Sequence, residues 1–201
     1  MTWNELRKAV LTKMFASENG AVNLEDRDHA DYLVSMPQAA NEAMQYICAA
    51  GRRPRRSALI PVRKKTTRQM VDIEAVCNDY FGCGNLEAYA RDDDGVLVPV
   101  AVSVTANSFL TIPPGVENVL WFYDAKPQYI TPETDGNTII DMDEDTLPLI
   151  AMYMAAELYK DDDVQIATIY RNEFEAMLAA LSQKPQGVYG GEFTSVTGWY
   201  E

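Results

Sequence analysis

Hydrophobic positions along the chain change their spacing twice. Near both ends, apolar residues recur every three to four positions, which predicts amphipathic helices. The expected helices cover residues 3–16, 28–50, 147–158 and 164–182. Between them lie short alternating runs rich in β-forming residues, which predict strands. The expected strands cover residues 58–63, 70–76, 85–91, 96–104, 108–112 and 117–124.

Turn and cap residues place the ends of these elements. Asn19-Gly20 ends the first helix, because both residues tolerate the left-handed conformation. Pro37 should break or kink the second helix, since it removes a backbone donor and clashes with the preceding turn. Asp92–Gly95 suits a hairpin turn, and Asp161–Asp163 suits the positive end of the last helix.

These patterns predict an α+β fold. The economical arrangement is an antiparallel helical bundle with an inserted antiparallel β-sandwich or small β-barrel domain, plus an extended C-terminal arm. The predicted units are residues 1–56 for the N-terminal helices, 57–140 for the β domain, 141–183 for a helical hairpin completing the bundle, and 184–201 for the arm.

The arm is rich in aromatic and aliphatic residues between glycines. They are Val188, Tyr189, Phe193, Val196, Trp199 and Tyr200. A solvated tail usually has few aromatics, whereas a segment that docks on another surface often has several. Docking on another protein is the favoured interpretation, and packing on the chain's own domain is the alternative.

Charge is unevenly distributed over the 201 residues. The formal net charge is -13, but residues 1–68 carry 12 basic and 7 acidic side chains and residues 69–201 carry 5 and 23. One run has eight basic residues and no acid: Arg52, Arg53, Arg55, Arg56, Arg63, Lys64, Lys65 and Arg68. It is either a solvated linker with basic flanks or a contact patch for phosphate or an acidic protein surface.

The sequence offers no catalytic or cofactor-binding motif, so an enzyme, a cofactor and a metal site are not expected. His29, the one histidine, lies among carboxylates at a helix start. Cys77 and Cys83 look like small buried residues, and the acidic triplets do not match calcium-loop spacing. No apolar stretch is long enough for a membrane span, no secretory signal is visible, and the cysteine content favours synthesis in a reducing cytoplasm.

Several segments resemble head–tail connector (adaptor) proteins of tailed bacteriophages and prophages. The strongest is residues 147–178, in which Leu158–Asp163 and Tyr170–Glu175 carry most of the likeness. Leu11–Phe15 and Met36–Ala43 resemble the N-terminal helices of the same group, and Val196–Trp199 resembles its tail. The β segment is the departure, because minimal adaptors are small helical bundles.

The resemblance implies a structural virion protein made in the host bacterial cytoplasm and placed in the phage neck. It implies a homo-oligomeric ring, usually dodecameric, between the portal protein and the tail-completion or stopper proteins. Packaged double-stranded DNA would pass through the channel. An acidic inner wall suits that passage, since it repels the phosphate backbone, whereas a basic wall would hold it.

An alternative from another class is a β-sandwich binding module on a helical base, recognising glycans or proteins at the virion surface. Its marker would be exposed aromatics on one sheet face, with Tyr80, Phe81, Trp121 and Tyr123 as candidates. The competing interpretation places them in the sandwich core. A small hydrolase is a third possibility, for which the sequence shows no site.

Overall fold

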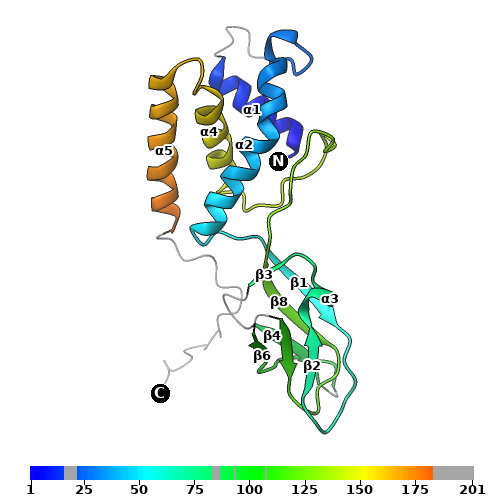
Figure 1. Ribbon diagram of the computed structural model, residues 1–201. Coiled ribbons are helices and arrows are strands. Elements are labelled where there is room, and N and C mark those ends of the chain that lie inside the picture. The colour runs from blue at the N-terminus through cyan, green and yellow to red at the C-terminus, as the bar shows by residue number, and fades with distance from the viewer. Residues whose placement is uncertain (16–21, 83–86, 93, 107, 183–201) are drawn as a thin grey trace, which may run out of the picture.

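A helical domain and a β domain follow one another along the long axis of the molecule (Figure 1). The computed structural model describes residues 1–15, 22–82, 87–92, 94–106 and 108–182. It confirms a mixed fold of helices and antiparallel sheets. Asn19-Gly20, Cys83 and the arm residues from 184 onward lie outside the described residues.

Both ends of the chain contribute to the helical domain. Its long helices are α1 (Trp3–Met14), α2 (Ala30–Ala49), α4 (Leu147–Leu158) and α5 (Val164–Ser182), and a short 3-10 helix, η1 (Arg27–His29), precedes α2. α4 lies at the centre, because α1, α2 and α5 each pack on it. Ten of its residues are buried, as expected for a helix that is apolar on nearly every face.

Local signals explain where most of these helices begin. Thr2 and Glu5 form a capping box at the start of α1, with Glu5 accepting from the Thr2 backbone N–H. Asp163 accepts backbone hydrogen bonds from the first turn of α5, as expected. The break expected at Pro37 does not occur, since the 20-residue helix α2 continues through it to Ala49. Pro37 is buried, as are Met36, Ala39 and Ala40 of the same helix, so burial of this part of α2 outweighs the lost backbone bond.

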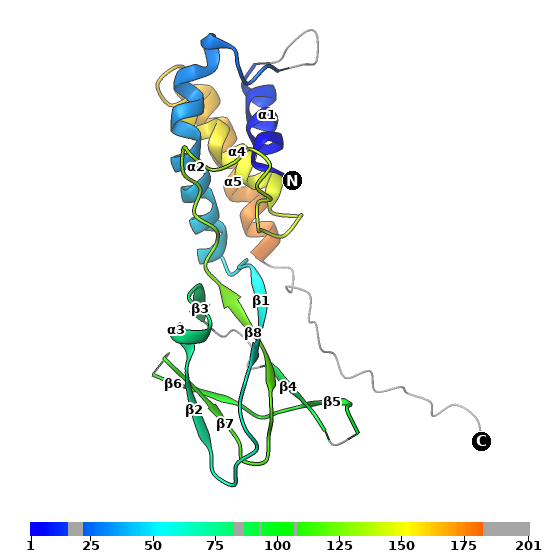
Figure 2. The same ribbon diagram turned by 90° about the vertical axis from the view of Figure 1, so that its right-hand side faces the viewer.

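Two antiparallel sheets form the β domain (Figure 2). The five-stranded sheet has the order β1-β8-β4-β5, with β3 also paired to β8. Its strands are β1 (Arg55–Ile60), β3 (Tyr80–Gly82), β4 (Ala88–Arg91), β5 (Leu97–Pro99) and β8 (Val119–Ala125). The three-stranded sheet has the order β2-β7-β6, from β2 (Gln69–Asp72), β6 (Ser103–Thr105) and β7 (Phe109–Ile112).

Two sequence predictions for this domain are wrong. The run 96–104 is not one strand, because β5 and β6 belong to different sheets. Within the described residues each of them pairs with a single strand, so the sheets end in open edges and the barrel alternative is excluded. The run 70–76 is a strand only to Asp72, whose side chain caps the short helix α3 (Ile73–Val76).

One core fills the β domain and both sheets contribute to it. Trp121 on β8 is fully buried and packs against Tyr80 and Tyr123. Leu110 and Ile112 enter the same cluster from the second sheet. The two domains therefore have separate cores, joined by the chain after α2 and the chain after β8.

Candidate interaction surfaces

The structure divides the basic run into two groups. Four arginines lie where the two domains meet, and we call them the arginine junction: Arg52, Arg53, Arg55 and Arg56. The others lie on the loop between β1 and β2, at the end of the β domain far from the helices (Figure 1). We call them the basic tip: Arg63, Lys64, Lys65 and Arg68.

Arg56 links the two domains directly. Its guanidinium pairs with Asp79, beside the β-domain core, and with Asp141, next to the helical core residue Ile140. Asp79 also accepts a hydrogen bond of 2.9 Å from the Tyr123 hydroxyl. Hydrogen bonding to Asp141, opposed by burial, raises the pKa of Arg56 above its ordinary value. The ion pairs therefore hold this charge in place between the domains.

The other junction arginines also have carboxylate partners. Arg52 is buried, donates a 2.9 Å hydrogen bond to the Leu181 carbonyl at the end of α5, and lies 3.9 Å from Asp145. Arg55 pairs with Glu87 at 2.6 Å. Arg53 lies 3.6 Å from Asp124, and its guanidinium stacks 4.4 Å from the Phe81 ring centre. The arginine junction therefore uses its charges in contacts within its own chain.

The basic tip is open to solvent instead. All four of its side chains are exposed. Three of them, Arg63, Lys65 and Arg68, line a hollow of about 410 Å³ and make no ion pair with any described residue. Hydrogen bonds from Gly115 N–H to the Lys65 carbonyl and from Gln69 to the Arg63 carbonyl hold the loop backbone. Such a loop suits contact with a negatively charged surface.

The four candidate aromatics of the binding-module alternative do not form an exposed platform. Trp121, Tyr80 and Tyr123 are buried in the β-domain core, and only Phe81 is substantially exposed, at 50%. Burial, together with a hydrogen bond to Asp79, raises the pKa of Tyr123. These rings therefore stabilise the domain, and Phe81 packs on Arg53 of the arginine junction.

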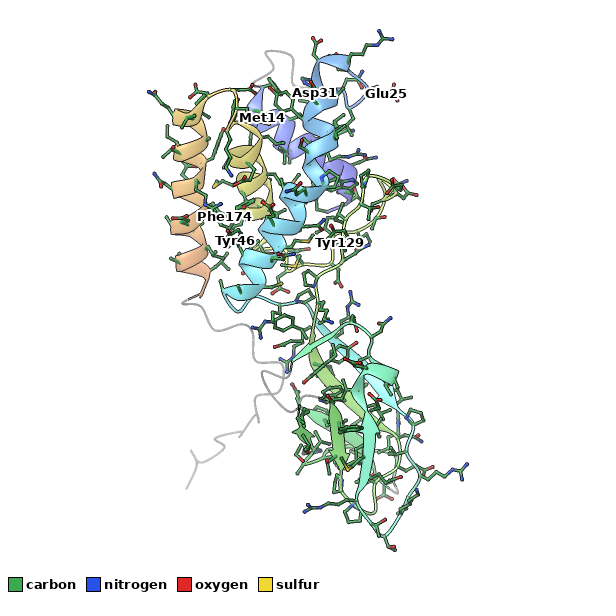
Figure 3. The ribbon with its side chains drawn as sticks, in the orientation of Figure 1. Met14, Glu25, Asp31, Tyr46, Tyr129 and Phe174 are labelled. Atoms are coloured by element: carbon green, nitrogen blue, oxygen red, sulfur yellow. The ribbon has the colours of Figure 1, made fainter. Side chains whose placement is uncertain are left out.

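A groove that the sequence did not reveal crosses the helical domain. It is lined by α2, α4 and α5 and has a volume of about 900 Å³. Arg171 of α5 lies across it, with its guanidinium 5.0 Å from the Tyr46 ring and 4.8 Å from the Tyr153 ring. The Phe174 ring of α5 lies 5.7 Å from the same guanidinium, and Figure 3 labels both Tyr46 and Phe174. Residues Tyr170–Glu175 carry part of the resemblance to phage adaptors, but the spacing of these residues did not indicate a groove.

The histidine and the two cysteines within the described residues pack against their neighbours. His29 stacks on Phe15 at 4.7 Å between ring centres. Cys48 and Cys77 are buried free thiols, and burial raises the pKa of Cys48 to about 11, which keeps it protonated and unreactive near neutral pH. Within the described ranges, no three His, Cys, Asp or Glu side chains converge as metal ligands. No helix there is both long enough and apolar enough to cross a bilayer.

Comparison with known families identifies one family for this chain. The chain matches the family model described as SU10 adaptor protein over residues 1–194, whereas no curated protein matches it. The match confirms the resemblance to phage adaptors. It also spans residues 57–140, so the β domain, treated from the sequence as a departure, lies within the family pattern. The chain therefore belongs to the SU10 adaptor family of structural phage proteins.

Proposed function

We propose that this protein forms a ring, usually of twelve copies, in the neck of a tailed-phage particle. The ring joins the portal protein to the tail-completion or stopper proteins and lines the channel through which packaged DNA passes. It has no enzymatic role. The observation that carries the proposal is the family match over residues 1–194.

Charge supports the channel role. The tip and junction hold the main positive run, and the junction arginines are paired within the chain. Outside that run the chain is strongly acidic, since it carries 30 acidic and 9 basic side chains. An acidic channel wall repels the DNA backbone and lets it slide without adhering.

Mass measurement tests the ring directly. We expect light scattering to show either a closed ring of the chain alone or a monomer that becomes a ring when portal protein is added. A chain that stays monomeric in both conditions contradicts the proposal. Deleting residues 186–201, which include the aromatic arm, should abolish ring or neck assembly while the described helices still fold. Unchanged assembly would exclude the arm as a docking element.

The basic tip is the part of the basic run that we propose contacts a partner, either an acidic protein surface or DNA. Reversing Arg63, Lys65 and Arg68 to Glu should weaken portal docking or DNA retention without breaking an ion pair of the described chain. The matched control reverses Lys8, Lys13 and Arg27, which are exposed on the helical domain and change the net charge equally. Equal effects of the two triple variants would show that the tip acts only through its contribution to the net charge.

A further inference from the structure

A groove lies beside the central helix, between α2 and α5, although α4 itself is buried on nearly every face. α2 and α5 both pack on α4, but they make few contacts with each other. The groove of about 900 Å³ lies between them, over the face of α4 that carries Tyr153 and Ala156. Its exposed rim includes Tyr46 at 47% and Val164 at 68%, large apolar side chains that a further segment would cover.

Charges inside the groove already satisfy one another. Arg171 lies 3.4 Å from Glu157 and 3.0 Å from Glu175. Glu157 also pairs with Lys160, and Glu42 accepts a hydrogen bond of 3.1 Å from the Tyr153 hydroxyl. Burial opposes the charge of Arg171, but hydrogen bonds to Glu175, Tyr153 and Tyr46 raise its pKa overall. The groove therefore offers a ligand the exposed Tyr46 and small apolar side chains, beside charges that are paired with one another.

The apolar surface continues beyond this groove. A second hollow of about 380 Å³ lies at the foot of α2 and shares Gln45 and Ala49 with the first. Its walls include Met44, Phe81 and Tyr129, and Tyr129 is 70% exposed. A segment lying over both hollows would cover exposed aromatic side chains from both domains.

The C-terminal segment has the composition that this surface requires. Between Val188 and Tyr200 its only charged residue is Glu192, and six of its residues are large and apolar or aromatic. Aromatic anchors in a charge-neutral, ring-lined groove are typical of strong docking contacts.

The length of that segment lets it reach a groove on another copy. Residues 183–201 follow α5 and can span about 60 Å when extended, at about 3.3 Å per residue. From the end of α5 back to Arg171 of the same chain is only about 16 Å along the helix, at about 1.5 Å per residue. Trp199 and Tyr200 lie at the far end of this tether. We infer that the groove between α2 and α5 receives residues 188–201 of a neighbouring copy, an inference that rests on the proposed ring.

Photo-cross-linking of the full-length chain tests this docking. A benzoylphenylalanine replaces Trp199, and ¹⁵N-labelled and unlabelled copies are mixed before irradiation. We expect cross-linked peptides that join a labelled segment 188–201 to an unlabelled α2, α4 or α5. Ala49→Arg, at an exposed groove position, should reduce their yield about tenfold, because it places an unpaired guanidinium in the apolar surface. Ala176→Arg, exposed on α5 and outside the groove lining, should leave the yield unchanged.

Three results would overturn the inference. They are cross-links confined to one isotopic label, cross-links that avoid the groove helices, and equal yields from the two arginine variants. Light scattering on the same samples separates this failure from failure of the proposed function. A ring that forms without groove cross-links leaves the ring intact and removes the groove as the arm's site. A chain that remains monomeric and gives no mixed-label cross-link removes both.

Discussion

Arg171 holds three helices together at one point, and replacing it with methionine tests what this contributes. Its guanidinium faces the rings of Tyr46, Tyr153 and Phe174 at 5.0, 4.8 and 5.7 Å. It also pairs with Glu157 and Glu175. Methionine keeps a flexible apolar stem of similar reach but removes the charge and the planar donors.

The expected loss can be estimated from these contacts. A partly exposed cation–π contact contributes about 0.5–1 kcal/mol, and three that share one guanidinium do not add fully, so about 1–2 kcal/mol is reasonable. The two ion pairs add about 0.5 kcal/mol each, the weaker being that with Glu175, which is 60% exposed. Arg171→Met should therefore lower the free energy of unfolding by about 2–3 kcal/mol.

Urea denaturation followed by helical circular dichroism measures this change. With an m-value of about 2 kcal/mol/M, the midpoint should fall by about 1 M. Arg171→Lys keeps the charge but not the planar stacking, so it should recover less than half of the loss. Arg27→Met is the control, because Arg27 is exposed and makes no ion pair within the described chain.

If Arg171→Met changed the free energy of unfolding by less than about 0.5 kcal/mol, the reasoning would be refuted, since changes of that size are usual for surface substitutions. Full recovery by lysine would show that charge alone matters and that the ring contacts are incidental. Equal losses in Arg171→Met and Arg27→Met would assign the effect to net charge instead of to the cluster.

Three further predictions concern the joint and the two cores. Arg56→Met should lower the free energy of unfolding by about 1–2 kcal/mol, a modest loss because the pairs of Arg56 with Asp79 and Asp141 are partly exposed. Small-angle scattering should show that the two domains are less tightly held together. An unchanged scattering profile would contradict the linking role. The free energy of unfolding should fall as pH rises from 9 to about 11, because the folded Cys48 thiol keeps its proton while the unfolded thiol loses it. In urea titrations, Cys48→Ala should remove up to about 2–3 kcal/mol of that fall. Identical pH profiles for the variant and the original chain would exclude this cause. Trp121→Ala should cost about 3–5 kcal/mol in thermal unfolding, whereas half-exposed Phe81→Ala should cost under about 1.5 kcal/mol; the reverse order would reopen an exposed aromatic platform.

Helices were predictable from the sequence because each buries a periodic face. α4 and α5 have the predicted bounds, and α1 and α2 lie within theirs. The strands were harder. The alternation of 96–104 continues through Pro99 and Val102, and alternation reports which side chains face inward, not which sheet the chain joins. At 70–76, the cap formed by Asp72 competes with strand continuation, and a four-residue helix leaves no periodic signal.

The contacts between distant residues were beyond the sequence. Arg56 finds its partners 23 and 85 residues away, and no local pattern marks Asp79 or Asp141 among 30 acidic residues. The groove was invisible for a related reason. A uniformly apolar α4 indicates burial on all sides but not which neighbours provide it, so the groove between α2 and α5 emerges only from packing.

The basic run consists of two groups, the arginine junction and the basic tip, and this changes how we expect the two domains of the adaptor to move. Arg52 binds the end of α5, and Arg56 binds a carboxylate on each domain, so the β domain cannot turn freely on the helices without breaking these pairs. These pairs therefore favour one placement of the basic tip relative to the end of α5 at Ser182, after which the C-terminal arm follows. In the proposed ring, a partner bound at the tip and a neighbour bound by the arm would be connected through the arginine junction. Weakening the junction should then reduce assembly even when the tip and the arm are unaltered.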